Sequence, residues 1–415
     1  MFSDRTNWRL SPNRFTQAVE EVRARGSKIL DLTVSNPTRV GLEYDLDVIL
    51  AAFSSAKMLD YDPQAKGLLS ARQAVTRYYR ERDVASNVTA DAENIVLTTS
   101  TSEGYSFVFR LLCNPGDEVL VPKPSYPLFE FLADLQDVKL VPYPLIYDHG
   151  WQIDFHSLEK AVSPRTRAAV VVHPNNPTGS YAKPGEIEML NSICRKRDLA
   201  LIVDEVFLDY ELNHVATAAP GYPVGRSSTR SPAASSESEP YGSFAHNQDV
   251  LTFTLSGLSK ISVLPQMKVA WIVTNGPRAQ AASAMERLEV IADTYLSMNA
   301  PIQWAVPTLL QQRRRIQRQL LQRVEANLTE MDRQLSSQKI CQRLEIEGGW
   351  YAVLRVPVMR SDEELAIELV REQCVLVHPG HFYDFPGDGY LILSLIGELE
   401  EFRQGVSRVL NCFQE

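Results

Sequence analysis

The sequence predicts an α/β fold: a mostly parallel sheet flanked by helices, with a smaller α+β domain beside it. The chain has 415 residues, more than one hydrophobic core of ordinary size organises, so we expect two domains. Short apolar runs rich in β-branched residues alternate with longer stretches in which apolar residues recur at helical spacing. This alternation favours parallel strands joined by covering helices. The runs expected to be buried strands are 118–122, 167–174, 199–206, 250–255 and 268–273.

Helical patterns and a second group of strands complete the expected architecture. Residues 98–112 lead from small hydroxyl residues into a helix, and 184–198 is amphipathic. The stretch 311–335 is a long helix with an arginine run, and the net acidity of the chain favours a solvated connecting helix over a nucleic-acid-binding face. Strands and turns of the smaller domain are expected at 348–357, 374–383 and 389–395.

We place the large domain at 46–300 and build the small domain from both ends of the chain, 1–45 and 301–415. One segment inside the large domain breaks the pattern. Residues 219–249 are rich in Ser, Pro and Gly and have little to bury, so we interpret them as a mobile surface insertion. A phosphorylatable or partner-binding loop is the alternative.

Charge and composition exclude several classes of protein. A formal net charge of -9 argues against nucleic acid and acidic membrane surfaces as main partners. No apolar run approaches the roughly 18 residues that a membrane span needs, and we expect no secretory signal. The five cysteines form no CxxC pair, and the histidines are few. We therefore expect no metal site and a cytoplasmic protein.

Lys260 is the first candidate catalytic residue. It lies in the stretch TLSGLSKISVLPQMKVAWIV (254–273), among apolar neighbours such as Leu258 and Val263. Desolvation disfavours the ammonium form, so a lysine in such a setting can be a neutral amine. A neutral amine forms Schiff bases with carbonyl compounds, including an aldehyde cofactor. For any lysine taken alone, a solvated surface charge is the alternative.

Three further features suit an aldehyde cofactor. Asp204 in VDEVF lies near the C-terminal end of an expected strand, where ligands of open α/β sheets bind, and its carboxylate can keep a pyridine nitrogen protonated. Asn176 in HPNNPTG also follows a strand and can donate a hydrogen bond to a ring oxygen. Thr101 and Ser102 precede a helix whose N-terminal amides suit a phosphate. Taken singly, a loop-capping role for Asp204 and a turn role for Asn176 are the alternatives.

The order and spacing of these motifs resemble those of the fold-type I pyridoxal-phosphate (PLP) enzymes, specifically the class I/II aminotransferases. The resemblance runs from DLTVSNPT (31–38) to the C-terminal domain. It implies that Lys260 forms the Schiff base with PLP and shuttles protons, and that Asp204 pairs with the ring nitrogen. The remaining implied contacts are Asn176 with the phenolic oxygen and the substrate, Thr101 and Ser102 with the phosphate, Tyr126 with the ring, and Ser35 with the substrate carboxylate.

The resemblance also implies an assembly. Tyr61, in YDPQAKGLLSARQAV, falls where a family tyrosine reaches the phosphate of a neighbouring subunit. We therefore expect a homodimer with shared active sites.

Two positions depart from the family pattern around the cofactor. Lys268 stands where an arginine usually grips the phosphate. Lysine keeps the positive charge but loses the bidentate fork, so somewhat weaker phosphate binding is expected. Phe207 replaces a tyrosine that donates a hydrogen bond to the phenolic oxygen, so we expect the Schiff base to hold its proton with a different affinity.

A third departure concerns the substrate. GYLILS places Ile392 where the family's arginine clamps the α-carboxylate. Another cation such as Arg39 takes over the carboxylate, or the donor lacks one there, or the protein no longer transaminates ordinary amino acids. We favour the relocated clamp, with a surface salt bridge as the alternative role of Arg39. His378 and His381 either line the pocket or pack the small domain.

The resemblance predicts an aminotransferase that moves an amino group from an amino acid to a 2-oxo acid, in a ping-pong mechanism through pyridoxamine phosphate. A PLP-dependent decarboxylase or C–S/β-elimination lyase is the alternative, and a non-catalytic PLP-binding protein is a further one. A nicotinamide-dependent dehydrogenase is excluded because no GxGxxG motif follows a strand.

Overall fold

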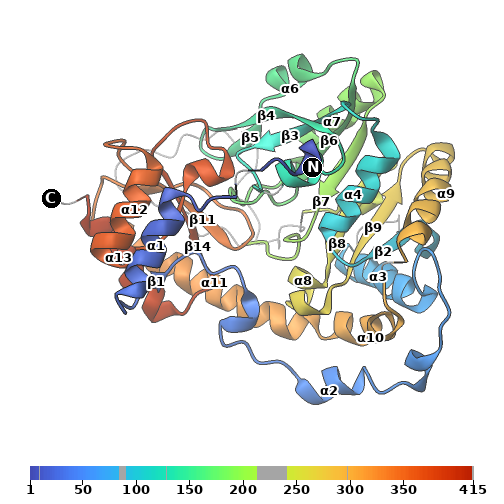
Figure 1. The fold of residues 1–415 in the computed structure, drawn as a ribbon, viewed down its shortest axis with the longest axis horizontal. Helices are drawn as coiled ribbons and strands as arrows, with labels where there is room; N and C mark the ends of the chain where they lie inside the picture. The colour runs from blue at the N-terminus through green and yellow to red at the C-terminus, as the bar shows by residue number, and fades with distance from the viewer. Residues whose placement is uncertain (9, 84–89, 128, 213–240, 297, 414–415) are drawn as a thin grey trace, which may run out of the picture.

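The computed structural model describes residues 1–415 except 9, 84–89, 128, 213–240, 297 and 414–415. Its centre is an eight-stranded sheet (Figure 1). The strands pair in parallel from β8 to β4, and antiparallel pairs lie at both edges. In spatial order they are β2 (Ile95–Thr98), β9 (Ala270–Asn275), β8 (Thr252–Gly257), β7 (Ala200–Asp204), β6 (Thr166–Val172), β3 (Glu118–Lys123), β4 (Lys139–Tyr147) and β5 (Trp151–Ile153).

Helices cover both faces of this sheet, which is why its central strands are apolar on both sides. Alternate residues of one strand enter different cores: Ile202 packs with α4 and α9, whereas Leu201 packs with α7. The helices of this part are α2 (Leu46–Ala51), α3 (Leu69–Arg82), α4 (Thr101–Leu112), α5 (Phe129–Asp134), α6 (Phe155–Ala161), α7 (Pro184–Arg197), α8 (Leu258–Ile261), α9 (Arg278–Tyr295) and α10 (Ala300–Gln311).

A second, four-stranded antiparallel sheet lies at the other end of the molecule (Figure 1). Its order is β10 (Gln342–Arg343), β11 (Tyr351–Arg355), β14 (Tyr390–Ser394) and β13 (His378–Pro379). The N-terminal segment joins this end, because β1 (Leu30–Asp31) pairs in parallel with β12 (Val375–Leu376). The accompanying helices are α1 (Arg14–Ala24), α12 (Asp362–Gln373) and α13 (Leu399–Asn411).

The long helix α11 (Arg313–Leu335) runs between the two ends (Figure 1). Ile316, Leu320, Val324 and Leu328 recur every four residues and are buried, so one face of the helix carries an apolar stripe. The arginine run is only partly solvated, because Arg313 is buried and pairs with Glu81 at 2.6 Å. Within the described chain, no helix is long and apolar enough to cross a membrane.

The expected insertion at 219–249 needs a correction at its end. Residues 219–240 lie outside the described residues, but 241–249 are built into the fold. Phe244 and Ala245 are buried, and the Phe244 N–H donates to the Glu205 carboxylate at 2.6 Å. Most of the serine and proline that suggested a mobile loop precedes Tyr241, and only Ser243 follows it. Phe244 is a buried apolar residue that this composition did not reveal.

Candidate active site

The candidate residues gather at the carboxyl ends of adjacent strands. Asp204 is the last residue of β7 and lies opposite Leu255 of β8. Lys260, five residues after Leu255, lies in α8, the single helical turn that follows β8. Gly257 permits this turn, because a Cβ atom there would lie 2.7 Å from the carbonyl oxygen of Val269.

Lys260 presents its amine to an aromatic pocket. Its Nζ lies 4.7 Å from the ring centre of Trp350 and 5.5 Å from that of Phe207. Burial against these rings lowers the pKa of the amine to about 8, and the charge of Asp204 opposes this effect. The amine is therefore far easier to deprotonate at neutral pH than an exposed lysine.

Asp204 is buried, with 7% of its surface exposed. Its Oδ1 accepts a hydrogen bond from the N–H of Val206 at 3.1 Å, and its Oδ2 accepts one from the Tyr105 hydroxyl at 3.3 Å. Burial raises the pKa of the carboxyl group to about 6. A buried carboxylate of this kind gains from any cation placed beside it.

The loop after β6 brings Asn176 to the same end of the sheet. Asn175 fixes this loop, since its Oδ1 accepts a hydrogen bond from the Thr178 hydroxyl at 3.0 Å. The Oδ1 atom of Asn176 is buried and has no hydrogen-bond partner among the described residues. A buried polar atom without a partner is costly, so this amide is suited to a polar group of a ligand.

Strand register places the α4 N-terminus beside the lysine turn. Thr98 of β2 lies opposite Ala270 of β9, and Gly257 of β8 lies opposite the same Ala270. Thr101 and Ser102 form the first turn of α4, directly after this row. The free N–H groups of a helix N-terminus attract anions.

Lys268 lies two residues before Ala270, and is therefore close to the same row. It is exposed and has a φ of 52°. A cation near a helix N-terminus adds to the attraction for a phosphate.

Tyr126 and Phe207 are aromatic residues near the two titratable groups, Tyr126 near Asp204 and Phe207 near Lys260. Burial, with a smaller contribution from the nearby charge of Asp204, raises the pKa of Tyr126 to about 12. Phe207 is buried and meets the Trp350 ring edge to face at 5.1 Å between ring centres.

Four residues singled out from the sequence do not join this buried group: three are exposed, and the fourth is buried in the four-stranded sheet. Tyr61, Ser35 and Arg39 are exposed, and Tyr61 retains 84% of its surface. Arg39 ends a 3₁₀ turn and makes no ion pair within the part of the chain that the structure describes. Ile392 is fully buried in β14, between Val353 and His378. No arginine side chain therefore occupies this position of the four-stranded sheet.

Three residues of the site escaped sequence reasoning. Tyr105 reaches Asp204 from the inner face of α4, and Trp350 reaches Lys260 from a turn ninety positions away in the chain. Tyr210 donates its hydroxyl hydrogen bond to the carbonyl oxygen of Lys260 at 2.7 Å. An aromatic residue in a helix or before a strand is ordinarily core, so only the tertiary contacts identify these three.

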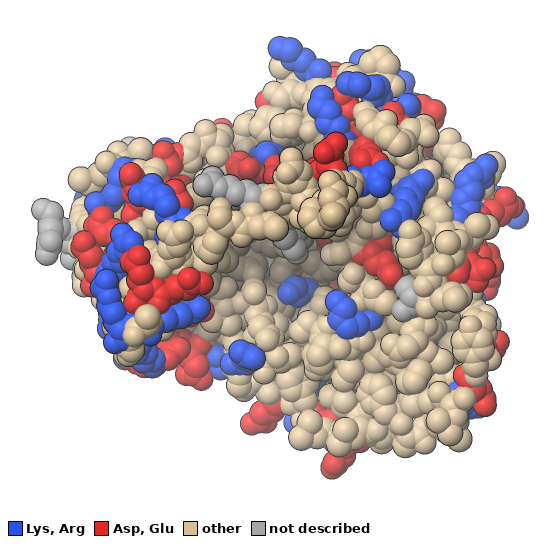
Figure 2. Space-filling model, in the orientation of Figure 1, with Lys and Arg blue, Asp and Glu red and all other residues tan. Residues whose placement is uncertain are grey.

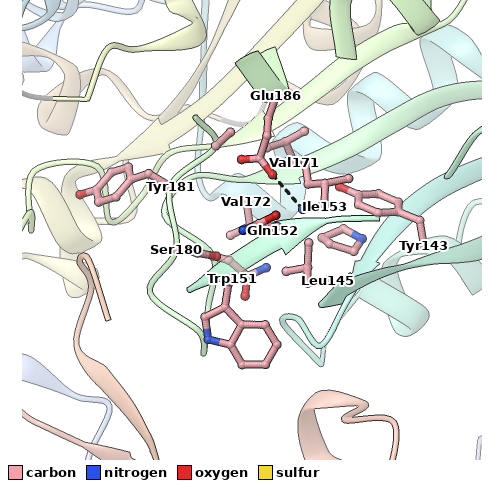
Figure 3. Close-up of a pocket in the computed structure, with 13 residues that line it drawn as sticks. Tyr143, Leu145, Trp151, Gln152, Ile153, Val171, Val172, Ser180, Tyr181 and Glu186 are labelled. Carbon is pink, nitrogen blue, oxygen red and sulfur yellow. Dashed lines mark hydrogen bonds between the residues drawn. The ribbon is translucent and has the colours of Figure 1, made fainter. Parts of the chain in front are cut away.

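The face shown in Figure 2 is hollowed between the two ends of the molecule, and basic side chains lie in and beside this hollow. A separate cavity of about 20 Å³ lies under β4 and β5, lined by Tyr143, Trp151 and Glu186 among others (Figure 3). This space suits a single water molecule. It contains neither Lys260 nor Asp204, so it is not the reaction site.

The comparisons with known proteins agree with this geometry. The family described as aminotransferase class I and II matches residues 27–404. The chain belongs to the class I and II aminotransferases. It is therefore a PLP-dependent aminotransferase, and it transfers amino groups.

Relatives of this aminotransferase include two bacterial enzymes. The glutamate-pyruvate aminotransferase AlaA of Haemophilus influenzae is 27% identical over 94% of this chain and 92% of its own. The alanine aminotransferase of Mycobacterium tuberculosis is 27% identical over 95% of this chain and 88% of its own. Among solved structures, alanine aminotransferase from Pyrococcus furiosus superposes with a TM-score of 0.85 at 20% identity, covering both chains fully. An aspartate aminotransferase from Thermus thermophilus gives 0.80 at 18% identity, covering 99% of each chain.

The residues of this aminotransferase fit its cofactor. PLP needs an amine for its aldehyde, an anion for its pyridinium nitrogen, a polar partner for its phenolic oxygen and an anion site for its phosphate. Lys260, Asp204, Asn176 and the α4 N-terminus offer these four groups at one end of the sheet. The orphaned Oδ1 of Asn176 calls for a ligand group that donates a hydrogen bond, while the Nδ2 of the same amide is the atom that would donate to the phenolic oxygen.

Proposed function

We propose that this aminotransferase moves an amino group from a small amino acid to a 2-oxo acid, with Lys260 and Asp204 as its catalytic residues. One observation supports the proposal most strongly. The desolvated amine of Lys260 lies in the turn after β8, and the buried carboxylate of Asp204 ends the adjacent parallel strand β7. The charge of each group shifts the pKa of the other. The names of the relatives make alanine and glutamate the first amino donors to test.

The bound cofactor supplies an electron sink that takes up the electron pair of the broken Cα–H bond. In this proposal the neutral Lys260 amine would accept the Cα proton of the donor and hold it at Nζ for the return transfer that completes amino-group exchange. The Asp204 carboxylate stays ionised and keeps the ring nitrogen protonated, while Tyr105 and the Val206 N–H hold the carboxylate in place. Asn176 would hold the phenolic oxygen of the ring through its amide, and Tyr126 would contact the ring.

We also propose that the phosphate binds at Thr101 and Ser102, with Lys268 as its cationic anchor. The register that aligns Thr98, Ala270 and Gly257 supports this placement.

Phe207 should change the proton affinity of the loaded centre. Phe207→Tyr adds a hydroxyl group that can donate to the phenolic oxygen, and a hydrogen bond to a charged oxygen stabilises it by roughly 1.5–3 kcal/mol. We expect the pH midpoint of the yellow absorbance in the PLP-loaded protein to move downward by about one unit. A spectrophotometric titration of both proteins tests this, and identical midpoints would refute a role for position 207.

The substrate carboxylate needs a partner other than residue 392, and we propose Arg39, assisted by the backbone at Ser35. Arg39 is an exposed cation with no ion pair among the described residues. Arg39→Ala should raise the apparent dissociation constant for the best donor by about tenfold, because a charge-assisted hydrogen bond contributes roughly 1.5–3 kcal/mol. Titration of the absorbance change measures this constant. An unchanged constant would assign Arg39 to the surface, and Arg25→Ala, another exposed arginine, is the control.

We propose a homodimer in which Tyr61 reaches the phosphate of the partner subunit. Leu59, Tyr61 and Leu296 expose large apolar surfaces around a cavity of about 380 Å³. Exposed apolar patches of this kind favour association. The division into a large domain at 46–300 and a small domain at 1–45 and 301–415, and a cytoplasmic location, remain predictions.

The test of the function is spectroscopic. The PLP-loaded protein is mixed with single amino acids, beginning with alanine and glutamate, while absorbance and products are recorded. Loss of the yellow band with release of a stoichiometric 2-oxo acid supports the proposal. Release of carbon dioxide or ammonia instead would favour the decarboxylase or lyase, and would overturn it.

A further inference from the structure

The amine of Lys260 rests against aromatic faces from two distant parts of the chain. Phe207 follows β7 of the central sheet, whereas Trp350 directly precedes β11 of the four-stranded sheet. The two rings meet edge to face, with centres 5.1 Å apart and planes inclined by 75°. The Nζ atom is nearer to Trp350 than to Phe207. Trp350 is thus the nearer of the two aromatic rings around the amine.

Trp350 is fixed by packing and by its backbone. It is 1% exposed, and its Nε1 is buried without a hydrogen-bond partner among the described residues. The Leu395 N–H donates to the Trp350 carbonyl oxygen at 2.8 Å, and the Gly349 N–H donates to the carbonyl oxygen of Tyr210 at 2.8 Å. A buried indole N–H without a partner costs free energy, so the position of this side chain depends on its ring contacts.

Tyr210 connects Trp350 with the lysine turn. Its ring meets the indole edge to face at 5.1 Å between centres, and its hydroxyl donates to the carbonyl oxygen of Lys260. The same tyrosine therefore packs against the wall of the pocket and holds the backbone of the lysine that points into it.

The indole acts on the amine in two opposing ways. Its π face attracts an ammonium group, while its bulk excludes the water that would solvate one. Burial is the larger effect on the pKa of Lys260, and Asp204 from β7 is the one charged group among the described residues that opposes it. An indole that keeps water away from the Lys260 amine therefore favours the neutral form of this amine.

We propose that Trp350 is a positioning residue for Lys260: its indole face, supported by Phe207 and Tyr210, holds the amine at the carboxyl end of the sheet and shields it from water. This inference rests on the proposed role of Lys260 and adds a residue to which no role has been assigned. It also explains why a bulky aromatic residue is buried with its N–H unpaired.

The test measures the amine itself in the cofactor-free protein. Acetylation of Lys260 by acetic anhydride, followed across pH by mass spectrometry of its peptide, reports the neutral fraction of the amine. In the wild type the midpoint should lie well below the usual lysine value of about 10.5. Trp350→Gln replaces the indole with a smaller polar amide and lets water reach the amine, so it should raise the midpoint by about one unit, a tenfold loss of neutral amine. Trp350→Phe keeps an apolar ring and should leave the midpoint within about half a unit.

Two controls isolate the effect. Lys57 also lies over an indole, with its Nζ 5.1 Å from the Trp304 ring centre, but it is exposed. Trp304→Gln should leave the Lys260 profile unchanged. Cooperative thermal unfolding of each variant shows that it is folded. If Trp350→Gln does not fold, Trp350→His decides the question, because its smaller polar ring should also raise the midpoint.

The possible results distinguish a failure of the Trp350 proposal from a failure of the proposed function. An unshifted midpoint in the folded polar variant, an equal upward shift in Trp350→Phe and the polar variant, or an ordinary wild-type midpoint would overturn the role of Trp350. Borohydride treatment of the PLP-loaded wild type tests the underlying function independently. Absence of PLP on Lys260 would contradict the proposed function, whatever Trp350 does.

Discussion

Lys260→Ala is expected to lower the rate of amino-group transfer by at least about 10³-fold, because proton transfer by a positioned side chain alone contributes roughly 10²–10⁴-fold. The variant also loses the amine that attaches the cofactor. The burial that lowers the pKa of Lys260 to about 8 is what lets this amine accept a proton near neutral pH. Initial rates with the best donor, at saturating PLP, measure the loss.

A matched control makes this result specific. Lys57→Ala removes an exposed lysine that also lies over a tryptophan ring, and it should leave the rate unchanged. If Lys260→Ala retained more than about a tenth of the wild-type rate, proton transfer would belong to another group. Lys268 is then the next residue to replace.

Asp204→Asn should lower the rate by about 10²–10⁴-fold while stabilising the cofactor-free protein. The amide cannot keep the ring nitrogen protonated, so the electron sink is lost. Its shape preserves the local contacts, since Oδ1 still accepts from the Val206 N–H and Nδ2 can donate to the Tyr105 hydroxyl. The two effects are measured by initial rates and by urea unfolding.

The stability effect has a defined pH window. Burial raises the pKa of Asp204 from 3.8 to about 6, so the folded state binds the proton more tightly than the unfolded state. Stability conferred by the protonated carboxyl group is therefore lost as pH rises from about 4 to about 6. Asparagine does not titrate, so the cofactor-free variant should be more stable than the wild type by about 2–3 kcal/mol at pH 8 and equal to it below pH 4.

Asp148→Asn is the control for this prediction, because Asp148 is exposed, with 84% of its side chain accessible. It should change neither the rate nor the pH dependence of unfolding. A stability difference for Asp204→Asn that does not vary with pH would show that the carboxyl group is not desolvated.

The sequence was most informative where local pattern and chemistry coincide. Asp204 was expected at a strand end because VDEVF follows an apolar run, and β7 does end at Asp204. The small and apolar residues around Lys260 predicted desolvation, and the pKa of its amine is lowered by burial. These features depend on neighbours in the chain, so the sequence alone is sufficient to find them.

Contacts across the fold could not be found in this way. Trp350 meets Lys260 because the turn before β11 is hydrogen-bonded to the backbone of Tyr210. No local sequence pattern predicts this long-range contact. Tyr105 is one of several aromatic residues on the inner face of α4, and only the tertiary structure distinguishes it by its bond to Asp204. Phe244 was assigned to an insertion because the serine-rich composition beside it masked a single buried anchor.

The central claim is that Lys260 carries the cofactor through which this aminotransferase works. The most direct measurement is borohydride reduction of the PLP-loaded protein, followed by peptide mapping with mass spectrometry. We predict one PLP per chain, attached to Lys260, and loss of this attachment when the protein is first converted by an amino donor in the absence of a 2-oxo acid. Attachment to another lysine, or a modification of Lys260 that the amino donor does not prevent, would contradict the account.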